Sequence, residues 1–246
     1  MGTYLITGAT GGIGAAVAGL LRERGHDLIL TGRSADRLKT LGDALTGGAH
    51  ARTQEFSISP NTAVAAAVHT LTLDLNEPRR LEAALAEADL PDRLDGVIHS
   101  AGVVHLGPVA ETEADEWLDH LNTNLVSAAE LTRILLPALR AARGHVVFVN
   151  STAGLRANPN WSAYAASKFG LRALADALRD EEPDLRVTTV YPGRTATEMQ
   201  RKVRAQEGHE YRAEDFADAA TVARVLVGAL ETPRDAVVSD VSVRPH

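Results

Sequence analysis

The sequence has no cysteine among its 246 residues, which excludes disulfide bonds, thiolate catalysis and cysteine metal ligands. It also has no basic excess. The formal net charge is −7, which argues against a nucleic-acid partner, because non-specific nucleic-acid binders need a positive surface. No apolar run approaches the roughly 20 residues that a membrane-spanning helix needs. The first residues enter a strand-like run with no basic and apolar leader before it, so we expect a cytoplasmic protein with no membrane association.

Short apolar runs alternate with alanine- and leucine-rich segments along the whole chain. The runs are continuously apolar, as in parallel strands that are buried on both faces; they lie at residues 4–7, 27–31, 70–73, 96–99, 145–150, 186–191 and 236–241. Between them, apolar side chains recur at helical spacing, for example over residues 13–21 and 171–178. This alternation predicts an α/β fold in one domain over residues 1–246, with a doubly wound parallel sheet of about seven strands and helices on both faces.

Two segments interrupt this alternation. The connection over residues 47–70 is longer than such connections usually are, which predicts either an extra helix or a surface loop. Residues 199–218 carry many charges of both signs and predict a surface helix or a mobile flap before the last helix.

The first predicted strand runs directly into a glycine-rich segment, Thr7-Gly8-Ala9-Thr10-Gly11-Gly12-Ile13-Gly14. Glycine lets the backbone turn sharply and approach a ligand closely, and the following helix offers unpaired N–H groups to an anion. This order of strand, glycine turn and helix predicts a diphosphate cradle. Its residues would be Gly8, Thr10, Gly12, Ile13 and Gly14. A tight turn without a ligand is the alternative.

The second predicted strand ends at Gly32, and Arg33 and Ser34 follow it. In dinucleotide-binding folds this strand end meets the adenosine ribose, where an acidic residue selects NAD and an arginine accommodates the 2′-phosphate of NADP. No acidic residue occurs here before Asp36. The sequence therefore favours NADP(H), with a solvated surface charge as the alternative for Arg33.

Asp74 and Leu75 follow the third predicted strand. The Asp74 carboxylate is predicted to accept a hydrogen bond from the adenine amino group. Alternatively, it caps a helix that starts near Pro78.

Tyr164 and Lys168 lie four residues apart in a strongly helical segment, so their side chains are one turn apart on the same face. A tyrosine with a pKa of about 10 is a poor acid or base at neutral pH, and a nearby positive charge lowers that pKa. The pair therefore predicts acid–base chemistry, although the same spacing also occurs in surface pairs. Ser151 follows the fifth predicted strand, at the sheet edge where open α/β sheets bind ligands.

Taken together, these segments resemble the short-chain dehydrogenase/reductase family in its compact single-domain branch, over residues 4–243. The resemblance implies a Rossmann fold and a catalytic tetrad of Asn124, Ser151, Tyr164 and Lys168. It also implies cofactor contacts from Tyr164, Lys168 and the segments after the fourth and sixth predicted strands, namely Ser100, Ala101, Gly102, Pro192, Gly193 and Thr195. Thr195 would meet the nicotinamide carboxamide.

The chain departs from the family pattern at one place. The family's usual Asn-Asn-Ala-Gly is His99-Ser100-Ala101-Gly102 here. We expect altered local hydrogen bonds with cofactor binding retained, His99 packed beneath the site, and His105 in the substrate loop.

The resemblance implies an NADP(H)-dependent oxidoreductase, with no metal, that interconverts a ketone or aldehyde with an alcohol. Ser151 would hold the carbonyl oxygen, Tyr164 would give the proton, Lys168 would lower the Tyr164 pKa and hold the ribose, and Asn124 would position a water molecule. The alternatives are a non-catalytic NADP(H)-binding sensor and a lyase or epimerase on the same scaffold. The family also implies a homodimer or homotetramer built on the helices that begin near Leu125 and Tyr164. The sequence does not identify the substrate.

Overall fold

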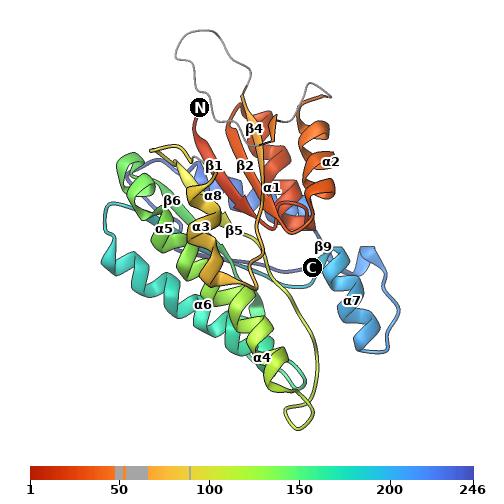
Figure 1. Cartoon of the computed structure of the whole chain (residues 1–246). Coiled ribbons are helices and arrows are strands. Elements are labelled where there is room, and N and C mark those ends of the chain that lie inside the picture. Colours follow the sequence, from red (N-terminus) through yellow and green to blue (C-terminus); the bar gives the residue numbers. More distant parts are fainter. Residues whose placement is uncertain (48–51, 54–65, 89) are drawn as a thin grey trace.

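Figure 1 shows the computed structural model of the chain, which describes residues 1–47, 52–53, 66–88 and 90–246. Most of the long connection over residues 47–70 lies outside the described residues. Among the described residues, no helix has both the length and the apolar composition to cross a membrane.

Strands and helices alternate along the chain as the sequence predicts. The strands are β1 (Thr3–Thr7), β2 (Asp27–Gly32), β3 (Arg52–Thr53), β4 (Val68–Thr72), β5 (Gly96–His99), β6 (His145–Val149), β7 (Arg186–Pro192), β8 (Thr195–Ala196), β9 (Ala217–Asp218) and β10 (Asp240–Val243). The helices are α1 (Gly12–Glu23), α2 (Ala35–Leu45), α3 (Leu81–Ala86), α4 (Ala114–Leu121), α5 (Ser127–Ala142), α6 (Ser162–Glu181), α7 (Glu198–Gln206) and α8 (Ala219–Leu230). Shorter helical turns are η1 (Pro78–Arg80), η2 (Asn122–Val126, a π-helix), η3 (Thr152–Gly154) and η4 (Ala213–Asp215).

The predicted doubly wound parallel sheet is confirmed. Its strand order is β10-β7-β6-β5-β1-β2-β4-β3, and all neighbours pair in parallel. The seven predicted strands are all present, and the two-residue β3 adds one at the edge. The strand order reverses between β1 and β5, and ligands of open α/β sheets bind at such a switch point.

Alternating residues of each strand feed two separate cores, because side chains of a strand point to opposite faces in turn. On one face, Ile6 and Ile98 pack with the apolar stripes of α1, α2 and α8. On the other face, Leu5 and Val97 pack with α5 and α6. Burial on both faces explains why the strands read as continuous apolar runs. In Figure 1, α3, α4, α5 and α6 accordingly lie on the visible side of the sheet.

The last strand is displaced from its predicted position. The sequence predicts residues 236–241, whereas β10 covers Asp240–Val243. The apolar run that suggested the earlier start forms no ladder with β7: the Val238 carbonyl oxygen accepts a bond from the Thr188 hydroxyl, and Val237 is 41% exposed. Residues 199–218 contain α7, which extends outward from the body of the sheet at the right of Figure 1.

Candidate active site

A cavity of about 1000 Å³ opens at the carboxyl ends of the strands, around the β1–β5 switch point. It brings together almost all the catalytic and cofactor-binding residues that are predicted from the sequence. Lining it are Gly8, Thr10, Gly12, Ile13, Gly14, Arg33, Ser34, Leu75, Ser100, Ala101, Gly102, Ser151, Tyr164, Lys168, Pro192, Gly193 and Thr195. Asp74 and Asn124 are not part of its lining. No group of three metal-ligating side chains occurs among the residues that the structure describes.

The glycine-rich turn between β1 and α1 forms one wall and has no room for a side chain at Gly8 or Gly14. Gly8 has a φ of +62°, and a Cβ there would lie 2.7 Å from Ala101 Cα. A Cβ on Gly14 would lie 2.4 Å from the Gly8 carbonyl oxygen. The N-cap residue of α1, Gly11, offers no side chain to the first-turn N–H groups. These amides at the positive end of a helix suit a diphosphate, so the residues present fit a dinucleotide.

Two arginines line the end of the cavity beyond β2. Arg33 follows the strand directly. Arg37 lies on the first turn of α2 and donates a 2.7 Å hydrogen bond to the Thr10 carbonyl oxygen. Ser34 caps α2 by accepting from the Arg37 N–H. Arg37 was not predicted from the sequence, although its position in the first turn after the Ser34 cap could have indicated it.

The side chain of Asp74 is exposed and stabilises the turn that it begins. Its Oδ1 accepts a 3.0 Å bond from the Asn76 N–H, and Asn76 lines the cavity together with Leu75. The helix-cap alternative is wrong, because η1 begins after Glu77 and not after Asp74. The contact of Asp74 with an adenine amino group stays a prediction.

Ser151, Tyr164 and Lys168 meet at the opposite end of the cavity. Ser151 follows β6 and is the N-cap of η3, since its Oγ accepts a hydrogen bond from the Ala153 N–H. Tyr164 and Lys168 lie on adjacent turns of α6, both deeply buried, and Ser151 and Tyr164 share a side-chain hydrogen bond. Lys168 Nζ donates to the Val149 carbonyl oxygen at 3.0 Å and lies 5.9 Å from the Tyr164 ring centre.

Burial governs the titration of this pair. It raises the pKa of Tyr164 above its usual 10.0, and the hydrogen bond from Ser151 only partly offsets this. It lowers the pKa of Lys168 to about 8. The predicted lowering of the Tyr164 pKa by Lys168 is therefore not seen in this arrangement, because the ammonium is directed to Val149 and desolvation of the phenolate dominates. The phenol is held protonated at neutral pH.

Asn124 lies behind the cavity wall, in η2, and all its amide atoms are engaged. Its Oδ1 accepts from the Val103 N–H at 2.8 Å, while Nδ2 donates to the Val103 carbonyl oxygen and to Ser167 Oγ, each at 3.0 Å. Ser167 Oγ in turn donates to the Tyr164 carbonyl oxygen. Asn124 thus connects the loop after β5 to the helix that carries the tyrosine.

Asn150 is a second amide that sequence reasoning missed. Its Oδ1 accepts from the Ser151 N–H at 2.8 Å, and its Nδ2 donates to the Lys168 carbonyl oxygen at 3.0 Å. It therefore fixes Ser151 relative to α6. It adjoins Ser151 in the sequence, but only the tertiary structure shows that its side chain reaches the neighbouring helix.

The segment that departs from the family pattern, His99-Ser100, is held to the end of β1, and retained cofactor binding stays a prediction. The N–H groups of Ser100 and Ala101 both donate to Thr7 Oγ1, at 3.1 and 3.2 Å. His99 is buried beneath the site, stacked on the Phe148 ring, which confirms its predicted position.

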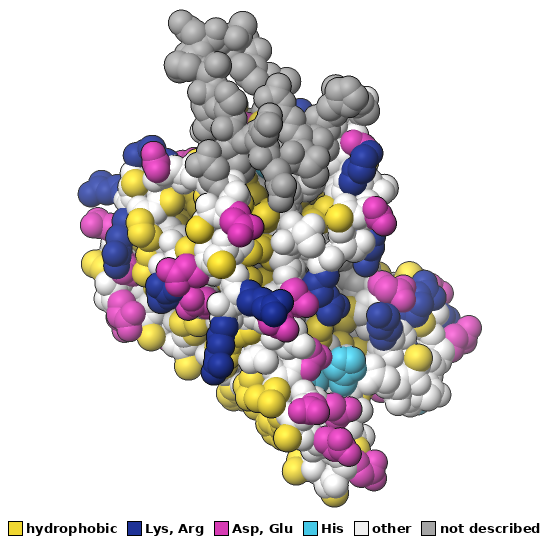
Figure 2. Space-filling model, in the orientation of Figure 1, with side chains coloured by type: hydrophobic (Ala, Val, Ile, Leu, Met, Phe, Trp, Pro, Cys, Tyr) yellow, Lys and Arg dark blue, Asp and Glu magenta, His cyan; other side chains and the backbone are white. Residues whose placement is uncertain are grey.

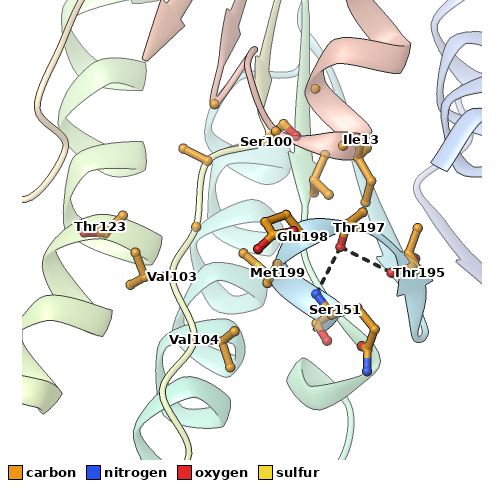
Figure 3. A pocket seen from close by; sticks show the side chains of 18 of the residues that line it. Ile13, Ser100, Val103, Val104, Thr123, Ser151, Thr195, Thr197, Glu198 and Met199 are labelled. Carbon is orange, nitrogen blue, oxygen red and sulfur yellow. Dashed lines mark hydrogen bonds between the residues drawn. The ribbon is translucent and has the colours of Figure 1, made fainter. Parts of the chain in front are cut away.

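Around Tyr164 the cavity is walled by the loop after β5, the start of α6 and α7. Figure 3 shows Val103 and Val104 on the loop after β5, with Glu198 and Met199 of α7 across the pocket from this loop. Trp161 packs edge-on against the Tyr164 ring. His105 lines the cavity as predicted, and beneath it lies His120, which the sequence analysis did not consider.

Comparison with known proteins identifies the family. The family model for short chain dehydrogenases matches residues 3–208. The chain belongs to the short-chain dehydrogenase/reductase family. A relative within it, dehydrogenase/reductase SDR family member 7B of Bos taurus, is 31% identical over 246 residues, which cover 96% of this chain and 73% of the relative.

Solved structures with the same fold have been determined with NADP compounds bound. An alcohol dehydrogenase from Thermococcus sibiricus, complexed with 5-hydroxy-NADP, superposes with a TM-score of 0.83 at 23% identity over 99% of this chain and 96% of that one. A short-chain dehydrogenase from Sphingobium yanoikuyae in complex with NADPH gives a TM-score of 0.79 at 25% identity, over 98% and 87%.

Proposed function

We propose that this protein is an NADP(H)-dependent oxidoreductase that reduces a ketone or aldehyde to an alcohol, or catalyses the reverse reaction. The observation that carries the proposal is the meeting of Ser151, Tyr164 and Lys168 at one end of a continuous cavity whose other end is lined by Arg33 and Arg37. The NADP compounds in solved structures of the family support the choice of cofactor.

The glycine-rich turn would hold the diphosphate, Arg33 and Arg37 the 2′-phosphate, Lys168 the ribose and Thr195 the carboxamide. When bound, the cofactor supplies the hydride. Ser151 Oγ donates a hydrogen bond to the substrate carbonyl oxygen, and Tyr164 Oη transfers its proton to the same oxygen.

The raised pKa of Tyr164 suits this direction, since the phenol is already protonated at neutral pH. Lys168, with a pKa of about 8, is mostly protonated there, which suits its proposed hydrogen bonds to the ribose hydroxyls. Asn124 holds Val103 and Ser167 in place beside Tyr164 and Lys168 through its hydrogen bonds. We propose that Asn124 also holds the water molecule that returns the proton to Tyr164.

The Tyr164→Phe variant tests the chemistry. Removing a general acid typically costs about 10²- to 10⁴-fold in turnover. NADPH affinity should change far less, because the glycine-rich turn, the two arginines and Lys168 still hold the cofactor. Turnover is followed by NADPH absorbance with a panel of ketones and aldehydes, and affinity by NADPH fluorescence. Tyr211→Phe, outside the cavity lining, is the matched control.

Each alternative gives a different result. A Tyr164→Phe protein with near-normal turnover overturns the mechanism. NADPH binding without turnover of any carbonyl in the wild type favours a sensor. Product formation without net change in NADPH favours a lyase or epimerase.

Parallel assays with NADPH and NADH test the cofactor preference. Loss of one charged hydrogen bond costs about 1.5–3 kcal/mol. Arg33→Ser and Arg37→Ser should therefore each raise the KM for NADPH by about 10- to 100-fold. The KM for NADH should change little, because NADH has no 2′-phosphate. A wild type that prefers NADH refutes the assignment of Arg33 and Arg37.

We also propose that the protein is a homodimer built on α4, η2 and α6. These elements pack together and leave Leu118, Val126 and Phe169 exposed by 52%, 42% and 42%. Figure 2 shows hydrophobic side chains gathered low on the visible face, in the region of α4 and α6. Sedimentation should give a dimer for the wild type and for the control Val237→Asp, and a monomer for Leu118→Asp/Phe169→Asp. A monomeric wild type contradicts the proposal.

A further inference from the structure

His120 is the only residue of α4 whose side chain is fully buried. Both of its ring nitrogens have partners. Nδ1 lies 2.6 Å from the Glu116 carbonyl oxygen, which can only accept, so Nδ1 carries the proton. Nε2 therefore has a free lone pair, and it accepts a 3.0 Å hydrogen bond from the His105 N–H. The bonds on both sides of the ring require the neutral imidazole in this one tautomer.

The bond to His105 is one of a series that fixes the substrate loop, residues 103–107. The Val103 N–H donates to Asn124 Oδ1, the Leu106 N–H to Gln206 Oε1 of α7, and the Gly107 N–H to the Asn160 carbonyl oxygen. Each amide is held by a different element, and α4 holds its amide through His120. Val103, Val104 and His105 of this loop form the cavity wall that faces the catalytic end.

The His120 ring also contacts the catalytic tyrosine. It packs edge-on against the Tyr164 ring, with ring centres 6.2 Å apart, and edge-on against the His105 ring at 5.5 Å. His120 itself does not line the cavity. It can therefore affect the reaction only through the residues that it holds.

We propose that His120 is a positioning residue which, as a neutral hydrogen-bond acceptor, fixes the substrate loop and the Tyr164 ring, and which releases the loop when it is protonated. This inference rests on the proposed function for its catalytic consequence but not for its structural one. A proton on Nε2 would put two donors face to face, so the bond to the His105 N–H would break.

The groups around the His120 ring determine the pH at which the ring binds a second proton. The His105 imidazole faces it from the loop after β5, Tyr164 from α6, and Glu116 and Asp119 from α4 itself. Asp119 Oδ2 lies 3.4 Å from His105 Nε2. Burial is the largest influence and lowers the pKa of His120 below 6.5. The loop is thus held at neutral pH and released in acid.

Two variants separate the positioning role from a merely structural one. His120→Leu removes the acceptor. His120→Gln keeps a neutral acceptor of similar reach at every pH. We expect His120→Leu to raise the KM for the carbonyl substrate by about tenfold, the effect of losing one buried hydrogen bond, with an unchanged Kd for NADPH. We expect His120→Gln to restore the wild-type KM at pH 7.5.

The pH profile of kcat/KM is the decisive readout. The wild type should lose activity as the pH falls below 6.5, whereas His120→Gln should stay flat over the same range. His105→Asn, which removes the neighbouring imidazole, should keep the acid limb of the profile. An identical acid limb in wild type and His120→Gln overturns the proposal.

Hydrogen exchange of the peptide that covers residues 103–107 tests the same idea without catalysis. At neutral pH, His120→Leu should exchange about tenfold faster than the wild type, and His120→Gln at the wild-type rate. Equal exchange in all three proteins overturns the positioning role. A wild type that turns over no carbonyl refutes the proposed function alone, since the exchange result still decides the role of His120.

Discussion

Acid should destabilise this protein steeply, because two of its buried histidines, His99 and His145, stay neutral in the folded state down to about pH 3. His99 lies beneath the cavity with Nε2 3.0 Å from Thr132 Oγ1, and burial lowers its pKa to about 3. His145 in β6 lies 2.7 Å from Thr188 Oγ1, and burial likewise lowers its pKa to about 3. The ordinary pKa of both imidazoles, which applies to the unfolded chain, is 6.5.

The size of the effect follows from these values. Between pH 6.5 and 3 the unfolded chain binds a proton at each histidine and the folded protein does not, so the free energy of unfolding falls as the pH falls. Each group contributes about 1.4 kcal/mol per pH unit. At pH 4.5 each should therefore remove about 2.7 kcal/mol, and the two together about 5 kcal/mol, which approaches the whole stability of many domains. Above pH 6.5 both states are neutral at these positions and the effect disappears.

Urea unfolding at pH 7.5 and pH 4.5, followed by circular dichroism, measures this contribution. The loss in unfolding free energy between the two pH values should be about 2.7 kcal/mol smaller in His99→Leu than in the wild type. His209→Leu, on the exposed turn after α7, is the matched control and should lose as much as the wild type. The reasoning is refuted if His99→Leu also loses as much as the wild type.

Two substitutions and one pH profile test the site further. Gly14→Ala would place a Cβ 2.4 Å from the Gly8 carbonyl oxygen. We therefore expect a stability that is about 1–3 kcal/mol lower in thermal melts and weaker NADPH binding by fluorescence. An unchanged NADPH affinity would contradict the assignment of this turn as the diphosphate site. Asn150→Ala removes the hydrogen bonds to Ser151 and α6, so kcat should fall by about tenfold at constant NADPH affinity. An unchanged kcat would contradict the role of Asn150 in fixing Ser151. Alcohol oxidation needs the Tyr164 phenolate, whose pKa is raised, so its rate should climb from pH 7 to 10, and a flat profile would argue against this base.

The sequence by itself determined the features that depend on local chemistry. Continuous apolar runs require strands buried on both faces, so the parallel sheet followed from them. The glycine-rich turn after β1 and the four-residue spacing of Tyr164 and Lys168 are set by backbone geometry within a few residues, and both are found in the cavity. Six of the strands begin and end within two residues of their predicted bounds, because each is a continuous apolar run that is buried in the sheet.

The tertiary structure alone decided what depends on distant segments meeting. Arg37 reaches the cavity because α2 turns its first residues toward Thr10. His120 lies against Tyr164 only because α4 packs on α6. The direction of the Tyr164 pKa could not be predicted from its spacing to Lys168, because it is set by how completely the fold removes water from the phenol. A sequence records which groups are neighbours along the chain, whereas burial and facing partners are properties of the packed molecule.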